Sequence, residues 1–156
     1  MSKSLTYLLI VLLFLSLFVS LPVYPSLLLP LIFLPPSRFG LMSLWSYVAY
    51  AGIFFLPFLG GVSSLSYLFG AFAEEVFFRA YLTPQLGNIR ASFIFALAHL
   101  SVRFNLFSAL TFFPSLFLGW VYMRTRSLPL SVLLHTLFNL LWFNYIAPLF
   151  SPQHPV

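Results

Sequence analysis

Glu74 and Glu75 are the only acidic residues in this 156-residue chain, and they stand side by side within the apolar stretch 67–82. A carboxylate in hydrocarbon costs about 3 kcal/mol or more, so such a residue usually has a partner or a chemical task. Arg79 follows Glu75 by four positions, which puts both side chains on one face of a helix, where acid and base can pair. Glu74 points about 100° away from Glu75, and it therefore remains available to contact another segment.

Three more polar side chains lie within apolar stretches further along the chain: His99, His135 and Asn139. Like Glu74, each lies six to ten residues from a polar loop that is predicted to be on the same side of the bundle. At about 1.5 Å per helical residue, these side chains would lie roughly 9–15 Å below a common surface. We therefore expect three helices to bring their polar groups together in one pocket.

The types of these side chains fit hydrolysis of an amide bond by water. A buried carboxylate beside an imidazole can take a proton from a water molecule. His135 and Asn139 are four residues apart and share a helical face, from which they can donate hydrogen bonds to an oxyanion. Such a scheme needs no serine or cysteine nucleophile.

A zinc site is the alternative for the same residues. One glutamate and two histidines are the ligands of many catalytic zinc ions, so Glu74, His99 and His135 are the second-choice set. Their spacing differs from the His-Glu-x-x-His pattern of zinc peptidases. We therefore place the interpretation without metal or other cofactor first and zinc second.

The composition predicts a protein that lies in a lipid bilayer. Hydrophobic residues make up 62% of the chain, charged residues 6%, and the mean hydropathy is +1.04. A soluble domain of this size could not bury so much apolar surface. The net charge of +5 comes from basic residues scattered singly at segment ends, which argues against nucleic acid binding and favours contact with anionic headgroups. The absence of cysteine excludes disulfides and thiolate metal sites.

We expect an all-α fold, a polytopic transmembrane helix bundle of about six to seven spans, some of them short or re-entrant. Residues 1–156 are expected to form a single integral membrane domain that ends in a loose tail at 151–156. A kink is expected at Pro114. The predicted apolar segments are 5–36, which crosses once or twice, then 41–59, 65–83, 91–102, 106–123 and 130–150.

Four arginines, Arg38, Arg90, Arg124 and Arg126, fall in loops that share one face if the spans alternate. The positive-inside rule makes that face cytoplasmic. We therefore expect a multi-pass protein of the cell inner membrane, with its polar pocket open to the cytoplasmic side.

The polar residues also form three spaced motifs in a fixed order. They are Glu74-Glu75-x-x-x-Arg79, Phe95-x-x-x-His99 and His135-x-x-x-Asn139. Together they resemble the CAAX-protease and bacteriocin-processing family (Abi, CPBP), a group of glutamate-type intramembrane proteases that includes the eukaryotic CAAX prenyl endopeptidase. The resemblance covers residues 65–142, about half of the chain.

The resemblance implies peptide-bond cleavage that depends on glutamate and uses no metal. Carried over by motif, Glu74 would be the catalytic glutamate and His99 its partner in activating water. His135 and Asn139 would form the oxyanion site. Glu75 and Arg79 belong to the same motif as Glu74 and would be orienting or structural groups. Phe95 belongs to the second motif and would be a supporting residue.

The function we expect is therefore that of an intramembrane endopeptidase acting on a membrane-bound or leader-bearing peptide. Its partners would be that substrate and the bilayer, and not nucleic acid. The alternative is a non-enzymatic immunity or partner-binding membrane protein, in which the same polar cluster serves helix packing. A proton-coupled transporter is less favoured, because no inverted repeat is visible in the sequence.

Overall fold

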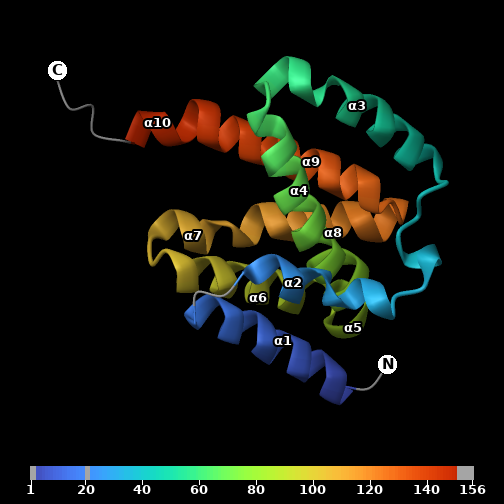
Figure 1. The fold of residues 1–156 in the computed structure, drawn as a ribbon, viewed down its shortest axis with the longest axis vertical. Helices are drawn as coiled ribbons and strands as arrows, with labels where there is room; N and C mark the ends of the chain where they lie inside the picture. The colour runs from blue at the N-terminus through green and yellow to red at the C-terminus, as the bar shows by residue number, and fades with distance from the viewer. Residues whose placement is uncertain (1–2, 20–21, 151–156) are drawn as a thin grey trace.

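Every regular element in the described chain is helical. The computed structural model describes residues 3–19 and 22–150, and no β-strand occurs among them. The tail predicted at 151–156 lies outside the described residues. The elements in chain order (Figure 1) are α1 Lys3–Phe18, α2 Val23–Leu28, η1 Leu29–Ile32, η2 Pro36–Arg38, α3 Leu44–Gly60, α4 Ser63–Glu75, η3 Val76–Leu82, α5 Thr83–Leu86, α6 Asn88–Val102, α7 Leu106–Leu110, α8 Phe112–Thr125, α9 Leu128–Leu141, η4 Trp142–Ile146 and α10 Ala147–Phe150.

Two helical stretches of the described chain are long and apolar enough to cross a bilayer. One covers Leu106–Thr125, and the other covers Leu128–Phe150. The other apolar helices are shorter, namely Lys3–Phe18, Val23–Ile32, Leu44–Gly60 and Asn88–Val102. The all-α prediction is therefore confirmed, whereas a bundle of six to seven spans is not confirmed by these helix lengths.

The predicted kink at Pro114 is seen as a break between α7 and α8. Helix α7 ends at Leu110 and α8 begins at Phe112. Proline has no backbone N–H, and its ring collides with the carbonyl group four residues earlier, which here belongs to Leu110. The regular helix is therefore interrupted one turn before the proline rather than at it.

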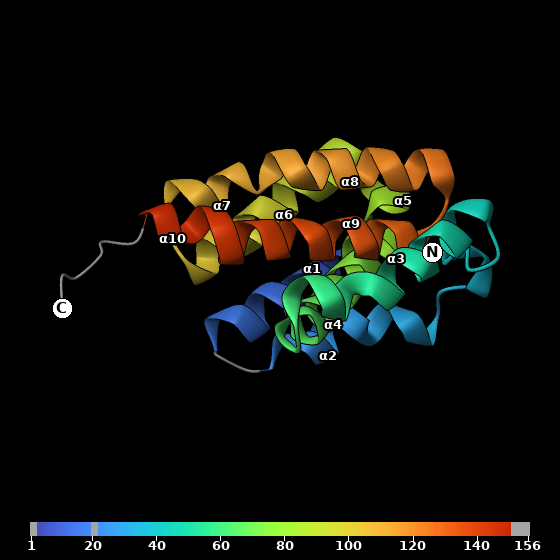
Figure 2. The ribbon, with the colours of Figure 1, turned by 90° about the horizontal axis from the view of Figure 1, so that it is seen from above.

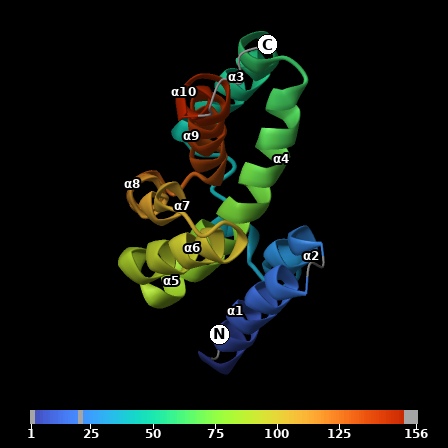
Figure 3. The same cartoon turned by 90° about the vertical axis from the view of Figure 1, so that its left-hand side faces the viewer.

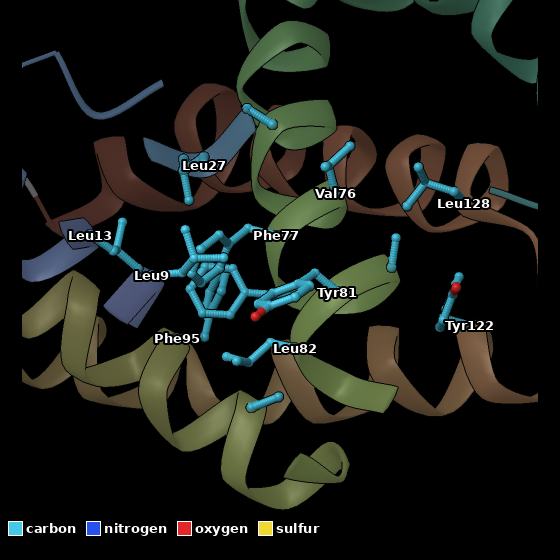
Figure 4. Packing of buried hydrophobic residues seen from close by; sticks show 14 of the residues in the cluster. Leu9, Leu13, Leu27, Val76, Phe77, Tyr81, Leu82, Phe95, Tyr122 and Leu128 are labelled. Atoms are coloured by element: carbon cyan, nitrogen blue, oxygen red, sulfur yellow. The ribbon is translucent and has the colours of Figure 1, made fainter. Parts of the chain in front are cut away.

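The π-helix η3 lies at the centre of the fold. It continues α4 without a break, and all seven of its residues are buried. Figure 4 shows Phe77 and Tyr81 of η3 packed beside Leu9 and Leu13 of α1. The Tyr81 hydroxyl also donates a hydrogen bond to Thr6 Oγ1 at 3.1 Å. Turns of π-helix occur frequently at functional sites. Because η3 directly follows the two glutamates, this part of the chain is a candidate functional site.

Helix α4 crosses α8 and α9 steeply. Helices α8 and α9 run side by side in Figures 1 and 2, and α4 runs across them in Figure 1. Figure 3 shows α4 along its length and the other two nearly end-on. The common-depth prediction treated the three polar helices as parallel. Helix α4 instead crosses its neighbours and packs extensively on α9. The acidic pair meets α9 because the helices cross.

Helix α3 approaches α9 closely through two glycines. A Cβ on Gly52 would lie 2.5 Å from Leu133 Cδ2, and one on Gly60 would collide with Leu140 Cδ2. Inside a bilayer, helices gain little from leaving lipid for protein, so small residues that allow close contact supply the packing energy. This seam holds α9, and with it His135, against the rest of the fold.

A second close contact joins the loop before α3 to the turn before α9. Gly40 has a φ of +57°, and a Cβ there would collide with the backbone carbonyl oxygen of Arg126. The Leu128 N–H donates to the Phe39 carbonyl at 3.0 Å. Gly40 is therefore required both for its left-handed conformation and for the space it leaves.

Gly40→Ala is expected to lower the free energy of unfolding by about 2 kcal/mol or more, since backbone strain and a backbone collision add. Thermal unfolding in detergent, followed by circular dichroism, measures the loss. Gly61→Ala is the control, because Gly61 has a φ of +60° and no atom within 4 Å of its added Cβ. Equal losses in the two variants would show that the collision with Arg126 does not matter.

Candidate active site

The two glutamates are the last two residues of α4, and their side chains have different surroundings. The Glu75 side chain is 0% exposed, and the Glu74 side chain is 26% exposed. Successive residues of a helix point about 100° apart, so only one of two adjacent side chains can enter the core. Glu75 takes the inward position, and Glu74 lies beside it at the edge.

Both carboxylate oxygens of Glu75 have a partner. The Arg79 Nε–H donates to Oε2 at 3.1 Å, and His135 Nδ1 lies 2.9 Å from Oε1. The pair predicted from the spacing of Glu75 and Arg79 is therefore present in the structure. A buried charge costs several kcal/mol unless it is paired and hydrogen-bonded, and these two contacts meet that requirement.

His135 lies between the two carboxylates. Its Nδ1 contacts Glu75, and its Nε2 lies 3.6 Å from Glu74 Oε2. An ionised carboxylate only accepts hydrogen bonds, so Nδ1 must carry a proton that it donates to Glu75. The other ring nitrogen, Nε2, then faces Glu74, either bare or as a second donor.

Glu74 keeps free hydrogen-bonding capacity. Its Oε2 atom is buried and has no hydrogen-bond partner among the described residues. The 3.6 Å separation from His135 Nε2 is longer than a hydrogen bond, but a water molecule can bond to both groups at once. Glu74 Oε2 thus retains an acceptor position that no described residue uses.

His99 is held by its own helix. Its Nδ1 lies 3.0 Å from the Phe95 carbonyl oxygen, and its ring stacks on the Phe95 ring with centroids 4.4 Å apart. Since a carbonyl only accepts, Nδ1 is the protonated nitrogen and Nε2 of the neutral ring is an acceptor. No ion pair joins His99 to Glu74 in the described chain; the histidine seen beside Glu74 is His135.

Phe95 separates the polar groups of this cluster. Its ring lies between two imidazoles, stacked on His99 and edge-on to His135 at 6.0 Å. The Arg79 guanidinium carbon lies 5.5 Å from the centre of the same ring, a distance at which a cation is attracted to an aromatic face. Phe95 thus supports three of the residues that the motifs single out.

Asn139 lies one helical turn after His135 on α9 and is half-buried. No side-chain hydrogen bond of Asn139 is seen within the described residues. The i, i+4 spacing places it on the same face as His135, so its amide can reach a group bound beside that ring.

Ser115 is the residue of this cluster that the sequence did not reveal. It lies on α8, is buried, and its Oγ accepts a hydrogen bond from Arg79 Nη2 at 3.0 Å. Serines in apolar helices commonly bond to their own backbone, so nothing in its local sequence distinguished it. With Ser115 included, a continuous chain of contacts runs from α8 through Arg79 and Glu75 to His135.

Ser115→Ala is expected to lower the free energy of unfolding by about 1–3 kcal/mol, the cost of leaving a buried charged donor without a partner. The effect is expected at the upper end, because Arg79 Nη1 already has no partner among the described residues. The control is Ser101→Ala, whose hydroxyl donates within α6 to the Ala98 carbonyl at 2.7 Å. Chemical or thermal unfolding in one detergent compares them, and indistinguishable stabilities would contradict the assignment.

The second-choice zinc set is not brought together as a ligand cluster. Within residues 3–19 and 22–150, no group of three histidine, cysteine, aspartate or glutamate side chains is placed to hold a metal ion. Glu75 has both oxygens engaged by Arg79 and His135.

An apolar groove of about 400 Å³ lies between α3, α4 and α9. Val132 of α9, which lines the groove, is three residues before His135, and Leu68 and Phe72 line it from α4. Residues three apart on a helix are neighbours on its surface. The groove thus reaches to within one helical turn of the polar cluster.

A protein-family model covers the part of the chain that builds this cluster. The model is described as type II CAAX prenyl endopeptidase Rce1-like, and it matches residues 60–141, more than half of the chain. The matched region contains all three motifs. Searches of curated proteins and of solved structures gave no match.

Proposed function

Because the chain belongs to the Rce1-like family of type II CAAX prenyl endopeptidases, we propose that it is a membrane-embedded endopeptidase in which Glu74 activates water. The observation that carries this proposal is the position of His135 between two carboxylates, with Nδ1 on Glu75 and Nε2 toward Glu74. This arrangement places a proton acceptor, Glu74, 3.6 Å from a donor that could serve an oxyanion, His135 Nε2.

In the proposed reaction, Glu74 takes a proton from a water molecule as the water oxygen attacks the carbonyl carbon of the scissile peptide bond. The tetrahedral intermediate carries its negative charge on the former carbonyl oxygen. The proton held by Glu74 then passes to the leaving nitrogen as the carbon–nitrogen bond breaks. The products are a carboxylate and an amine, and no covalent enzyme intermediate forms.

The two histidines are proposed to play different parts because their Nδ1 partners differ. His99 donates to a neutral carbonyl, which suits a neutral ring whose Nε2 accepts a hydrogen bond from the attacking water. His135 is flanked by two carboxylates, which balance the charge of a doubly protonated ring. Nε2 of that ring can donate to the oxyanion together with the amide of Asn139.

Glu75 and Arg79 are proposed to orient His135 rather than to touch the substrate. Both are fully buried, and the Glu75 carboxylate holds Nδ1 of the ring. A catalytic histidine commonly has its second nitrogen held by a carboxylate, which sets the orientation of the ring. Arg79 and Ser115 in turn hold the Glu75 carboxylate in place.

The proposed substrate is a membrane-bound or leader-bearing peptide, cleaved in the cytoplasmic half of the bilayer. The groove between α3, α4 and α9 would take an apolar part of that substrate, since the described lining near the site is hydrophobic. Polar peptide groups would then meet Glu74 and His135 at the end of the groove. The protein is proposed to be a multi-pass protein of the inner membrane, with its arginine-bearing loops on the cytoplasmic face.

Mass spectrometry of membrane peptides tests the function. Isolated membranes are incubated with the purified wild type or with His99→Ala, and new peptide ends are compared. Ends that appear only with the wild type support the proposal, and the sequences around them identify the substrate. Cleavage that persists in a chelator supports the metal-free scheme, whereas loss restored by zinc supports the alternative. Recovery of an intact bound partner, without new ends in either sample, would favour the non-enzymatic alternative.

A further inference from the structure

The basic residues outside the site have no acidic partner anywhere in the chain. The sequence has seven lysines and arginines and two acidic residues. Glu75 is bound to Arg79, and Glu74 lies beside His135. The remaining cations must therefore be balanced by anions that are not part of this chain.

Most of these cations gather at one end of the molecule. Helices α1 and α6 begin on the same side of Figure 1 on which α8 ends and α9 begins, and the turn between α6 and α7, which carries Arg103, lies on the opposite side. The basic residues at the first end are Lys3, Arg38, Arg90, Arg124 and Arg126.

A second groove, of about 450 Å³, lies along α1, α6 and α8, and its lining includes Arg90 of the basic end. This groove, called the lipid-sized groove below, is lined mainly by apolar side chains, with two polar groups among them. The walls include Ile89, Phe93, Ile94 and Phe112, and the polar groups are Tyr7 and Arg90. It is separate from the groove beside the polar cluster, with which it shares no lining residue.

Arg90 is placed to bind an anion in the lipid-sized groove. Its side chain is exposed, and no hydrogen bond or ion pair of its guanidinium is seen within the part of the chain that the structure describes. Lys3 is four residues before Tyr7 on α1, so the two share a helical face. One cation, Arg90, therefore lines the groove, and Lys3 lies one helical turn from its Tyr7.

We propose that the lipid-sized groove binds one anionic phospholipid, with an acyl chain against Phe93 and Phe112 and the phosphate on Arg90. The volume falls within the range of about 300–1,000 Å³ that is usual for sites of small molecules, which suits a single chain. Acyl chains pack no better on protein than on other lipids. The preference for this lipid therefore comes from its charged headgroup, and this site is independent of the peptidase reaction.

Native mass spectrometry of the delipidated protein in neutral detergent tests the site. The protein is titrated with phosphatidylglycerol or with phosphatidylcholine of the same acyl chains. We expect phosphatidylglycerol to bind more tightly, and Arg90→Gln to weaken its first binding step about fivefold, the effect of one basic residue near a phosphate. Phosphatidylcholine carries the same phosphate but also a choline cation that offsets it, so its binding should weaken less in that variant.

Arg103→Gln is the matched control, because Arg103 is also exposed but lies at the opposite end. It should leave the first binding step unchanged. If Arg90→Gln and Arg103→Gln lost equal affinity for phosphatidylglycerol, the proposal would be overturned. The lipid would then be attracted by the overall positive charge of the protein. Equal affinity for the two lipids, or displacement of the bound lipid by glycerol phosphate at matched concentration, would overturn the proposal as well. These readouts do not depend on peptide cleavage.

Discussion

Glu74→Gln is expected to slow peptide-bond cleavage by about 100- to 10,000-fold, the usual contribution of a general base. Glutamine keeps the shape of the side chain but cannot accept the proton of water. Stability should change little, since Glu74 is partly exposed and the buried ion pair is formed by Glu75. Single-turnover cleavage of the identified peptide measures the first effect, and thermal unfolding measures the second.

Glu74→Asp provides the matched variant, because it keeps a carboxylate at a shorter reach. It should retain more activity than Glu74→Gln at the same expression level. If Glu74→Gln kept wild-type activity, the Glu74 carboxylate would have no part in the chemical step. A large loss of stability in that variant would show that Glu74 has a structural role instead.

Arg79→Met is expected to destabilise the protein by about 3–5 kcal/mol, because it leaves the Glu75 carboxylate buried without its cation. The Nε–H contact of 3.1 Å is lost, and so is the contact from Nη2 to Ser115. The loss of stability is measured by unfolding the protein with increasing amounts of a denaturing detergent, while circular dichroism follows the helical content.

The double variant Glu75→Gln with Arg79→Met separates the loss of contacts from the burial of an unpaired charge. It removes the carboxylate charge, keeps a hydrogen-bonding group for His135, and should recover a large part of the stability lost in Arg79→Met. If the double variant is less stable than Arg79→Met alone, the ion pair is not the main source of the loss. Glu75→Gln by itself should leave Arg79 as the unpaired charge and cost a similar amount.

This ion pair links the fold to the proposed chemistry. Arg79 lies in the buried π-helix, Ser115 on α8, and His135 on α9, so one network joins three parts of the bundle. Such networks are costly when only partly satisfied. Variants that loosen the contact between α8 and η3 are therefore expected to affect both stability and the orientation of His135.

Local spacing was sufficient to predict several of these contacts. The i, i+4 rule gave the pair of Glu75 with Arg79 and the shared face of Phe95 and His99. The apolar composition predicted helices throughout, because an unpaired backbone group is too costly in lipid. The order of the three motifs identified the family that the chain belongs to. All of these follow from neighbours along the chain and from helical geometry.

The contacts between helices needed the tertiary structure. His135 meets Glu75 across 60 residues, and Ser115 meets Arg79 across 36. The sequence placed Glu74, His99 and His135 in one pocket, but it did not show that His135 is the histidine held between the two carboxylates. The angle at which two helices cross depends on how side chains from distant segments fit together. A helical period determines the face on which a residue lies, but only that packing determines which residue it meets.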